Sequence, residues 1–448
     1  MVITMLNVKE SSSANRSAYT ASQRQAISIS DLLALGVGLS SVIYINIGGN
    51  LYLAEIFLLL LLPYLIFKRR NLLQFGYFKT IIFLGGVWLL SQIITDLYRS
   101  TSATDIIKGW ALITVLLTNF LALYLLVFPS SRRIALGLLG FAIGTMLQPV
   151  LQPIGINMLM DPWKFGVGQA VALLVAAIAA LWSSAKQHKI VWWNVILIVI
   201  ALFSFYVRSR SLGGIVLITA LSVWFRFTRI GRSFALHLNN PVNIILGFIL
   251  FLSVALGIIQ MYGFAAEQGY FGEGSRFIYQ VQSSGKFGIM LGGRTEWWPA
   301  VHALMDSPVI GYGSYARDTK YGLYLYDLIN LGYDTTYLQL DNYLALYNSI
   351  PTHSHILQGW IWAGLAGAIF WIFTFGVIVR GMIMAYRRPT LLLSATLFLG
   401  VSALWNIFFS PLSNIGRLQW AFVLVTILYA LVNKPVFKDT DNTRNFLN

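Results

Sequence analysis

Long apolar runs follow one another along almost the whole chain and are separated by short polar stretches. Most of these runs approach the ~20 residues that an α-helix needs to cross the hydrocarbon core of a bilayer. The pattern predicts about twelve membrane-spanning helices in one membrane domain, and therefore an all-α polytopic membrane protein. The predicted spans are residues 31–47, 51–67, 78–95, 108–128, 134–152, 165–183, 191–207, 212–226, 242–262, 355–379, 390–409 and 418–433.

One segment, residues 263–354, interrupts this succession and is too polar to cross a bilayer. Irregular backbone exposed to lipid cannot satisfy its hydrogen-bonding groups, so we expect this segment to be a large water-facing loop that is partly helical. It divides the membrane domain into nine spans over residues 31–262 and three over residues 355–433. The polar ends, residues 1–30 and 434–448, are predicted to be tails.

Composition excludes a soluble globular protein. The chain of 448 residues is 57% hydrophobic and 10% charged, with a mean hydropathy of +0.70, whereas soluble domains carry about 25% charged residues. The absence of cysteine excludes disulfides, thiolate catalysis and Cys-ligated metals. The polar, Ser-rich start of the chain predicts no cleavable signal peptide.

The basic residues predict the orientation of the chain. If both termini are cytoplasmic, most of the 31 Lys and Arg residues fall on the cytoplasmic side, as the positive-inside rule requires. The net charge of +15 is then explained by topology and by contact with anionic lipid. We therefore expect no nucleic-acid partner.

Six arginines fall on the outer side and oppose this bias: Arg208, Arg210, Arg276, Arg294, Arg317 and Arg417. Arg208 and Arg210 stand at the junction of two spans, where guanidinium groups could bind phosphate oxygens in pairs. The alternative is that such arginines only extend toward lipid headgroups.

A second group of candidates lies within the loop. Gly292 and Gly293 are followed by an amphipathic pattern with Thr295 as its expected N-cap and Pro299 in its first turns. Three residues recur every four positions and would share one helix face: Arg294, Trp298 and His302. The alternative is an interfacial helix whose tryptophans lie at headgroup depth. A turn with Tyr312 follows, over residues 307–314.

Two histidines, His353 and His355, stand at the end of the loop, just before the tenth span. A neutral imidazole can accept a proton near pH 7, so a general base is expected here. Metal binding by the His-x-His pair and a purely structural role are the alternatives. No third ligand lies at a recognisable spacing, so we expect no metal.

These motifs, in this order, resemble those of the O-antigen ligase and polymerase family of bacterial membrane glycosyltransferases. The likeness covers roughly residues 195–375. It rests on Ser209-Arg210, on Arg294 with Trp298, Pro308, Gly311 and Gly313, and on His353-Ser354, Leu357-Gln358 and Gly364-Leu365-Ala366-Gly367. The chain departs from the family at Trp362-Ala363, where an acidic residue is frequent.

The resemblance implies a GT-C-like protein of the bacterial inner membrane with its long loop in the periplasm. Such an enzyme moves a glycan from undecaprenyl diphosphate to a hydroxyl acceptor on a glycan, a lipid core or another molecule, without metal or other cofactor. His353 would be the general base, and Arg210 and Arg294 would bind the diphosphate. Secondary candidates are Arg208 and Arg276 for the diphosphate, with His355, His302, Trp298 and Tyr312 elsewhere in the site.

A transporter or flippase of lipid-linked oligosaccharide is the alternative function, because its substrate carries the same diphosphate. Such proteins usually contain paired halves, and no half-to-half repeat is visible in this chain. Half of the 16 acidic residues lie in the one long loop. That concentration favours a folded extracytoplasmic site.

Overall fold

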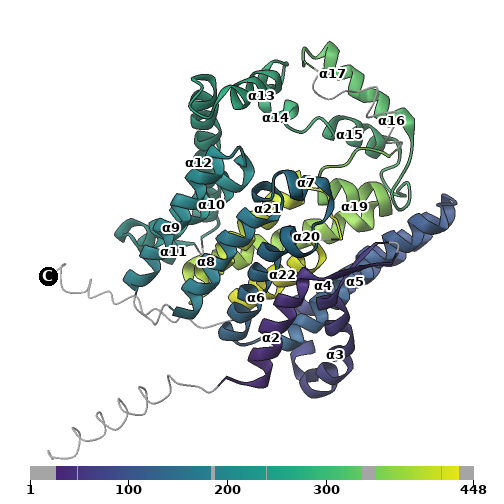
Figure 1. The fold of residues 1–448 in the computed structure, drawn as a ribbon. Helices are drawn as coiled ribbons and strands as arrows, with labels where there is room; N and C mark the ends of the chain where they lie inside the picture. Colours follow the sequence, from purple (N-terminus) through teal and green to yellow (C-terminus); the bar gives the residue numbers. More distant parts are fainter. Residues whose placement is uncertain are drawn as a thin grey trace, which may run out of the picture.

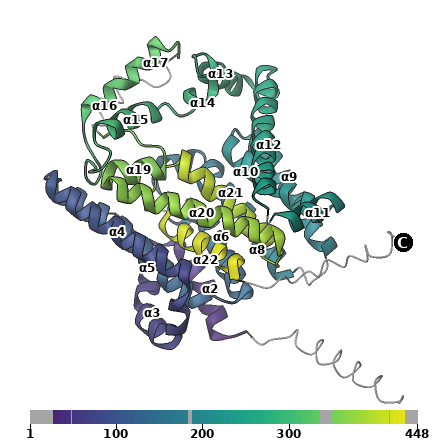
Figure 2. The same cartoon turned by 180° about the vertical axis from the view of Figure 1, so that it is seen from behind.

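Helices make up most of the described residues, and they form a bundle with a group of short helices at one end (Figures 1 and 2). The computed structural model describes residues 27–47, 49–182, 187–238, 240–334, 349–414 and 416–432. The predicted tails fall mostly on residues 1–26 and 433–448, outside the described residues, and helix α2 already begins at Ile29.

The longer helices of the bundle are α2 (Ile29–Leu39), α3 (Leu53–Arg69), α4 (Gly76–Tyr98), α5 (Ala103–Val127), α6 (Ser131–Leu151), α8 (Gly168–Trp182), α9 (Gln187–Tyr206), α10 (Arg210–Phe227), α12 (Pro241–Glu267), α20 (Leu365–Arg387), α21 (Leu393–Phe409) and α22 (Gly416–Val432). Short elements connect or extend them: η1 (Ser40–Val42), η2 (Arg70–Gln74), α7 (Gly155–Met160), η3 (Trp163–Val167), α11 (Arg229–His237) and α19 (His355–Ala363). An antiparallel hairpin of β1 (Tyr44–Asn46) and β2 (Asn50–Tyr52) precedes α3.

The long loop is folded into short helices: α13 (Glu273–Ser283), α14 (Gly288–Gly292), α15 (Trp297–Asp306), α16 (Thr319–Leu323), η4 (Tyr324–Tyr326) and α17 (Asp327–Asn330). They lie together at one end of the bundle, which we call the loop end (top of Figures 1 and 2). The expectation of a partly helical loop is met as far as Asn330, whereas residues 335–348 are outside the described part.

The expectation of an all-α membrane protein is confirmed. Among the described residues, seven helical segments are long and apolar enough to cross a bilayer: Gly76–Tyr98, Ala103–Val127, Ser131–Leu151, Trp163–Trp182, Arg210–Phe227, Pro241–Glu267 and Leu365–Arg387. Helix α12 has none of its apolar window buried inside the protein. An apolar face of that length requires a lipid environment. The count of twelve spans stays a prediction.

Two predicted spans have the wrong boundaries. The segment 31–47 is helical only to Val42 and then continues as strand β1. The segment 355–379 is not one helix, because the chain breaks at Gly364 into α19 and α20. Gly364 adopts φ +72°, a left-handed conformation that glycine accommodates without steric cost.

Helices α2 and α6 cross with their backbones in close approach. A Cβ atom on Gly38 would meet the Gly137 carbonyl, and one on Gly140 would meet the Leu35 carbonyl. Small residues permit such crossings, and the dispersion contacts they allow hold helices together inside a bilayer. The crossing joins α2 to the main core, whose largest fully buried side chains include Tyr124, Phe120 and Trp371.

The close crossing predicts that replacing two glycines of helix α2 by alanine will affect the stability of the protein differently. Gly38→Ala should destabilise the protein by about 1–3 kcal/mol, because its methyl group would overlap the backbone of α6. Gly36→Ala is the matched control, since no atom lies within 4 Å of a Cβ at that position. Thermal unfolding of the purified protein in detergent measures both, and equal midpoints for the two variants would contradict the described packing.

Candidate functional site

The loop is anchored in the bundle by the segment Val309–Ser314, which lies against the break between α19 and α20. Tyr312 N–H donates to the Ile361 carbonyl (2.6 Å) and Gly313 N–H donates to the Trp362 carbonyl (3.1 Å). Leu365 N–H donates back to the Val309 carbonyl (3.1 Å). The motif that contains Gly311 and Gly313 therefore contacts the motif that contains Gly364.

At two positions of this contact there is space for glycine only, and a buried carboxylate holds the end of the segment. A Cβ atom on Gly311 would meet the Trp362 carbonyl, and one on Gly364 would meet the Val309 carbonyl. Beyond the contact, Asp96 of α4 accepts hydrogen bonds from the backbone N–H of Ser314 (2.6 Å) and from its hydroxyl (2.7 Å). The position of the loop is thus set by backbone contacts on one side and by a hydrogen-bonded carboxylate on the other.

Arg210 is the first residue of α10 and follows the predicted junction of two spans. Its Nη1 donates to Oε1 of Gln282 at the end of α13 (3.0 Å), and its guanidinium lies 5.6 Å from the ring centroid of Tyr262. The side chain therefore connects the bundle to the first half of the loop.

Arg294 lies in the turn between α14 and α15, and its guanidinium is largely withdrawn from water. It lies over the rings of Trp405 and Phe409 of α21, at 5.4 and 5.6 Å from their centroids. Nη1 donates to the Gly293 carbonyl (2.6 Å), while the buried Nε has no hydrogen-bond partner in the described part of the chain. Burial lowers the pKa of Arg294, Glu296 opposes that shift and the charge of Arg210 adds to it.

His353 lies beside Glu296, with Nδ1 of the imidazole 3.5 Å from Oε1 of the carboxylate. The histidine side chain is 44% exposed and that of the glutamate 25% exposed, so both are open to a ligand. Ser354 fixes the backbone there, because its hydroxyl accepts from Leu357 N–H (3.2 Å) as the cap of α19 and donates to the Ile407 carbonyl (2.8 Å).

Two contacts, together with the charges of Glu296 and Arg210 that act on Arg294, relate five residues that we call the charged cluster: Arg210, Gln282, Arg294, Glu296 and His353. They come from three separate parts of the chain. Among the described residues, no carboxylate lies within ion-pair distance of Arg210 or Arg294. Two guanidinium groups without a paired carboxylate, next to an imidazole that faces a carboxylate, can bind an anion and accept a proton beside it.

Glu296 was missed by the sequence analysis. A carboxylate in a water-facing loop is ordinarily a solvated surface group, and nothing in its spacing sets it apart from the other acidic residues of the loop. The one available signal was its place two residues after Arg294.

The secondary arginines lie against α13. Arg276 pairs with Glu273 on its own helix (3.6 Å), and both side chains are well exposed. Arg208 has φ +63° and its guanidinium lies against Gly274. Within the described part of the chain, neither forms a hydrogen bond or ion pair with Arg294 or His353, so we assign them no role in the charged cluster.

His355 is buried and both of its ring nitrogens are occupied. Nδ1 donates to the Ser410 carbonyl and Nε2 accepts from the Trp420 indole N–H (2.7 Å). These partners fix a neutral imidazole with its proton on Nδ1. His355 therefore has a structural role in this state and has no free nitrogen with which to act as a base.

The aromatic candidates of the loop are engaged in packing. His302 stacks on Tyr324 with 4.0 Å between ring centroids, and Trp298 donates through its indole N–H to Asp327 (3.3 Å). The Tyr312 hydroxyl donates to the Ala303 carbonyl (2.8 Å) and contacts the Tyr321 hydroxyl (2.7 Å). These side chains hold the loop helices together.

The predicted start of the loop helix is wrong. Helix α15 begins at Trp297, its N-cap is Glu296, and no side chain caps it. Residues 294–298 first form a tight turn, in which Trp297 N–H donates to the Arg294 carbonyl (3.1 Å). Arg294 consequently lies outside the helix that carries Trp298 and His302. The predicted end is confirmed, because α15 ends at Asp306.

The last two outer arginines form ion pairs of contrasting burial. Arg417 is bidentate to Glu55, with Nε 3.0 Å from Oε1 and Nη2 2.8 Å from Oε2, and both side chains are less than 5% exposed. Arg317 pairs with Asp105 at 3.0 Å and is 65% exposed. Both arginines therefore have partners within the protein.

No model of a known protein family, no curated protein and no solved structure matches this chain.

The two ion pairs predict very different costs for the same substitution. Arg417→Met should destabilise the protein by about 3–5 kcal/mol, because it leaves the Glu55 carboxylate buried and unpaired. Arg317→Met is the comparison and should cost less, about 1 kcal/mol, because Arg317 is 65% exposed and the Ser102 hydroxyl still donates to the Asp105 carboxylate, which is itself only 8% exposed. Thermal midpoints measured in detergent compare the two. Equal shifts would show that the Arg417 pair is solvated.

Proposed function

We propose that the protein is a glycosyltransferase of the bacterial inner membrane. It moves a glycan from undecaprenyl diphosphate to a hydroxyl acceptor at the periplasmic face, as an O-antigen ligase or a surface-polysaccharide polymerase does. The observation that supports this most is the charged cluster, which relates the three residues singled out in separate motifs, Arg210, Arg294 and His353. The charges of Arg210 and Glu296 act on Arg294, and Glu296 faces His353.

Arg210 and Arg294 would stabilise the leaving diphosphate. A guanidinium group can hydrogen-bond two phosphate oxygens at once and carries its charge at any physiological pH. Arg294 is suited to this role because its buried Nε has no partner in the described part of the chain, and an anion would supply one. Arg210 would gain the same ligand while still held by Gln282.

His353 would be the general base. Its Nδ1 faces Glu296, which leaves Nε2 to accept the proton of the acceptor hydroxyl. The acceptor oxygen then forms a bond to the anomeric carbon, the bond from that carbon to the diphosphate oxygen breaks, and undecaprenyl diphosphate leaves with the electron pair. Glu296 would orient the imidazole and stabilise its charged form, as a carboxylate behind a catalytic histidine does.

The orientation predicted from the basic residues is compatible with this proposal. With both termini in the cytoplasm, the loop end faces the periplasm, where lipid-linked glycans would be presented. The apolar window of α12, none of which is buried inside the protein, would contact lipid beside the bundle. The polyprenyl chain could therefore remain in the bilayer while its diphosphate reaches the charged cluster.

Reconstitution into lipid vesicles with a defined undecaprenyl-diphosphate glycan tests the activity. The expected result is a longer glycan, or a capped lipid core when that acceptor is supplied, together with released undecaprenyl diphosphate. Movement of the intact donor between leaflets without any transfer would instead identify a flippase and would contradict the proposal.

Removing the base should abolish transfer but not binding. We expect His353→Ala to lower kcat by roughly 100-fold or more, as loss of a general base does, while the Kd for undecaprenyl diphosphate changes little. His237→Ala is the control, because that histidine is exposed on α11 and its imidazole hydrogen-bonds the Ser233 carbonyl of the same helix. Wild-type turnover in His353→Ala would exclude His353 as the base.

Replacing the planar guanidinium group of Arg294 by an ammonium group should also impair the enzyme. Arg294→Lys keeps the positive charge but cannot hydrogen-bond two phosphate oxygens side by side, so we expect kcat/KM to fall by about tenfold or more. Arg232→Lys, on the opposite side of the bundle in α11, is a matched control. An unchanged kcat/KM for Arg294→Lys would place the diphosphate elsewhere.

A further inference from the structure

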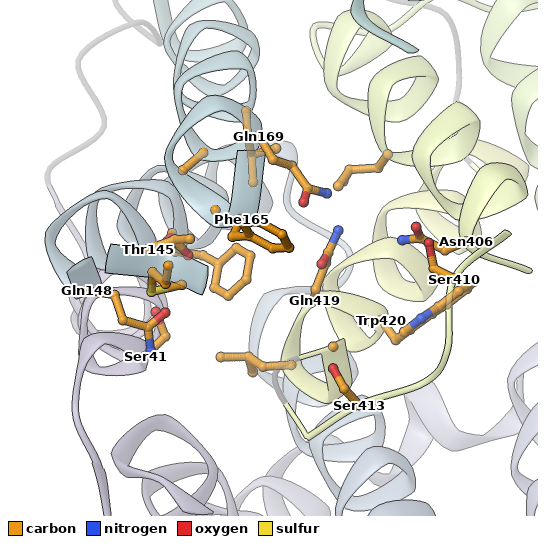
Figure 3. A pocket seen from close by; sticks show the side chains of 18 of the residues that line it. Ser41, Thr145, Gln148, Phe165, Gln169, Asn406, Ser410, Ser413, Gln419 and Trp420 are labelled. Carbon is orange, nitrogen blue, oxygen red and sulfur yellow. Dashed lines mark hydrogen bonds between the residues drawn. The ribbon is translucent and has the colours of Figure 1, made fainter. Parts of the chain in front are cut away.

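A polar cavity lies inside the bundle, next to the charged cluster but separate from it. Its volume is about 330 Å³, and it lies between α6, η3 and α8 on one side and α21 and α22 on the other (Figure 3). None of the charged-cluster residues lines it. Its position and chemistry therefore need their own explanation.

Side-chain amides and hydroxyl groups make up most of the polar lining of the cavity, and four of these residues carry amides. They come from both walls: Gln148, Gln169, Asn406 and Gln419. The side chains of Gln169 and Gln419 extend toward each other from opposite walls (Figure 3). Among the described residues that line the cavity there is no carboxylate, and Lys164 is the one Lys or Arg. Such a lining suits an uncharged ligand that both donates and accepts hydrogen bonds.

Gln148 gives the strongest sign that a ligand belongs here. Its side chain is buried, and Nε2 has no hydrogen-bond partner in the described part of the chain. The neighbouring Tyr52 hydroxyl is also buried and interacts with Gln148, but the two groups form no well-aligned hydrogen bond. A buried amide without a well-formed hydrogen bond is unfavourable, and a ligand with hydroxyl groups would supply the missing partner.

Aromatic rings supply the apolar part of the lining. Phe141, Phe165 and Trp420 line the cavity, and Trp420 is held in place by its hydrogen bond to His355. Amides that pair with hydroxyl groups, combined with rings that cover C–H faces, are suited to a sugar residue. The volume lies at the lower end of the range for ligand sites, about 300–1,000 Å³, so the cavity suits a small part of a glycan.

The end of α21 separates the cavity from the charged cluster. Trp405 and Phe409 lie against Arg294 on one side of this helix end, while Asn406 and Ser410 line the cavity on the other. The two histidines divide in the same way, since His353 belongs to the charged cluster and His355 to the cavity wall. A ligand could therefore place an anion at one site and an attached sugar at the other.

We propose that this cavity is a binding site for an uncharged sugar residue of one of the two glycan substrates. The sugar is either the one attached to the donor diphosphate or a residue of the acceptor. The identity of the ligand rests on the proposed function, but sugar binding is measured without turnover. Gln148 and Asn406 bind the hydroxyl groups from opposite walls, and Trp420 covers one face of the ring.

Binding to the protein in lipid nanodiscs tests this inference with three probes. They are undecaprenyl diphosphate, the same lipid bearing one N-acetylglucosamine, and free N,N′-diacetylchitobiose. We expect the wild-type protein to bind the sugar-bearing lipid about tenfold more tightly than the bare lipid if the cavity takes the donor sugar. Saturable binding of the disaccharide would instead assign the cavity to the acceptor. The inference would be overturned if the sugar-bearing lipid bound no more tightly than the bare lipid and the disaccharide did not bind.

Substitutions from both walls then locate the sugar. Gln148→Leu and Asn406→Leu should each remove the contribution of the sugar while leaving the Kd for bare undecaprenyl diphosphate within about twofold. Gln260→Leu is the matched control, because that amide is exposed on the lipid-facing helix α12. Sugar binding that survives both variants, or equal weakening of the bare lipid, would contradict the inference.

The same measurements separate this inference from the proposed function. Sugar binding that depends on Gln148 but occurs in a protein without transferase activity would leave the cavity assignment standing and remove the transferase. Glycosyl transfer with an unchanged KM in both leucine variants would support the transferase and remove the cavity assignment.

Discussion

The backbone contact between Val309–Ser314 and the helix break at Gly364 is the constraint on which the arrangement of the loop end depends. Three backbone hydrogen bonds join the two segments, and two glycines leave no space between them. Asp96 fixes the far end of the same segment. Helix α15 precedes this anchor and α19 ends at it, so the turn that carries Arg294 and the residue before Ser354 are held relative to the bundle. A charged cluster built on a loop is then as well placed as one built on the bundle.

Arg294 lies in the turn that this anchor positions, and its burial bears directly on the proposed binding of a diphosphate. Taking a guanidinium group out of water is unfavourable unless hydrogen bonds or an anion compensate. Here aromatic rings and one carbonyl compensate in part, and the charge of Arg210 adds to the cost, as the lowered pKa of Arg294 indicates. A site with two cations and an unsatisfied donor is arranged for a ligand with two or more negative charges. A lipid-linked diphosphate supplies them without a metal ion.

The helical membrane fold and the candidate residues Arg210, Arg294 and His353 could be identified from the sequence, because their signals are local. Arg210, Arg294 and His353 stood out, since charged and titratable residues are unusual between apolar runs. Most helices also followed from hydrophobic runs. The break at Gly364 was missed because it lies within a continuous apolar run, where only the packing of Val309 reveals it. Glu296 and the amide cavity were missed for a related reason. A loop carboxylate, or one amide per helix, is ordinary in sequence and becomes informative only when distant segments meet.

The most direct test of the central claim is a cryo-electron microscopy structure with undecaprenyl diphosphate bound. The account predicts diphosphate oxygens within hydrogen-bond distance, about 2.7–3.2 Å, of both Arg210 and Arg294, with the Nε of Arg294 among the donors and His353 free beside the leaving oxygen. Diphosphate density at another place, with the Arg294 guanidinium still bound only to the Gly293 carbonyl, would contradict it.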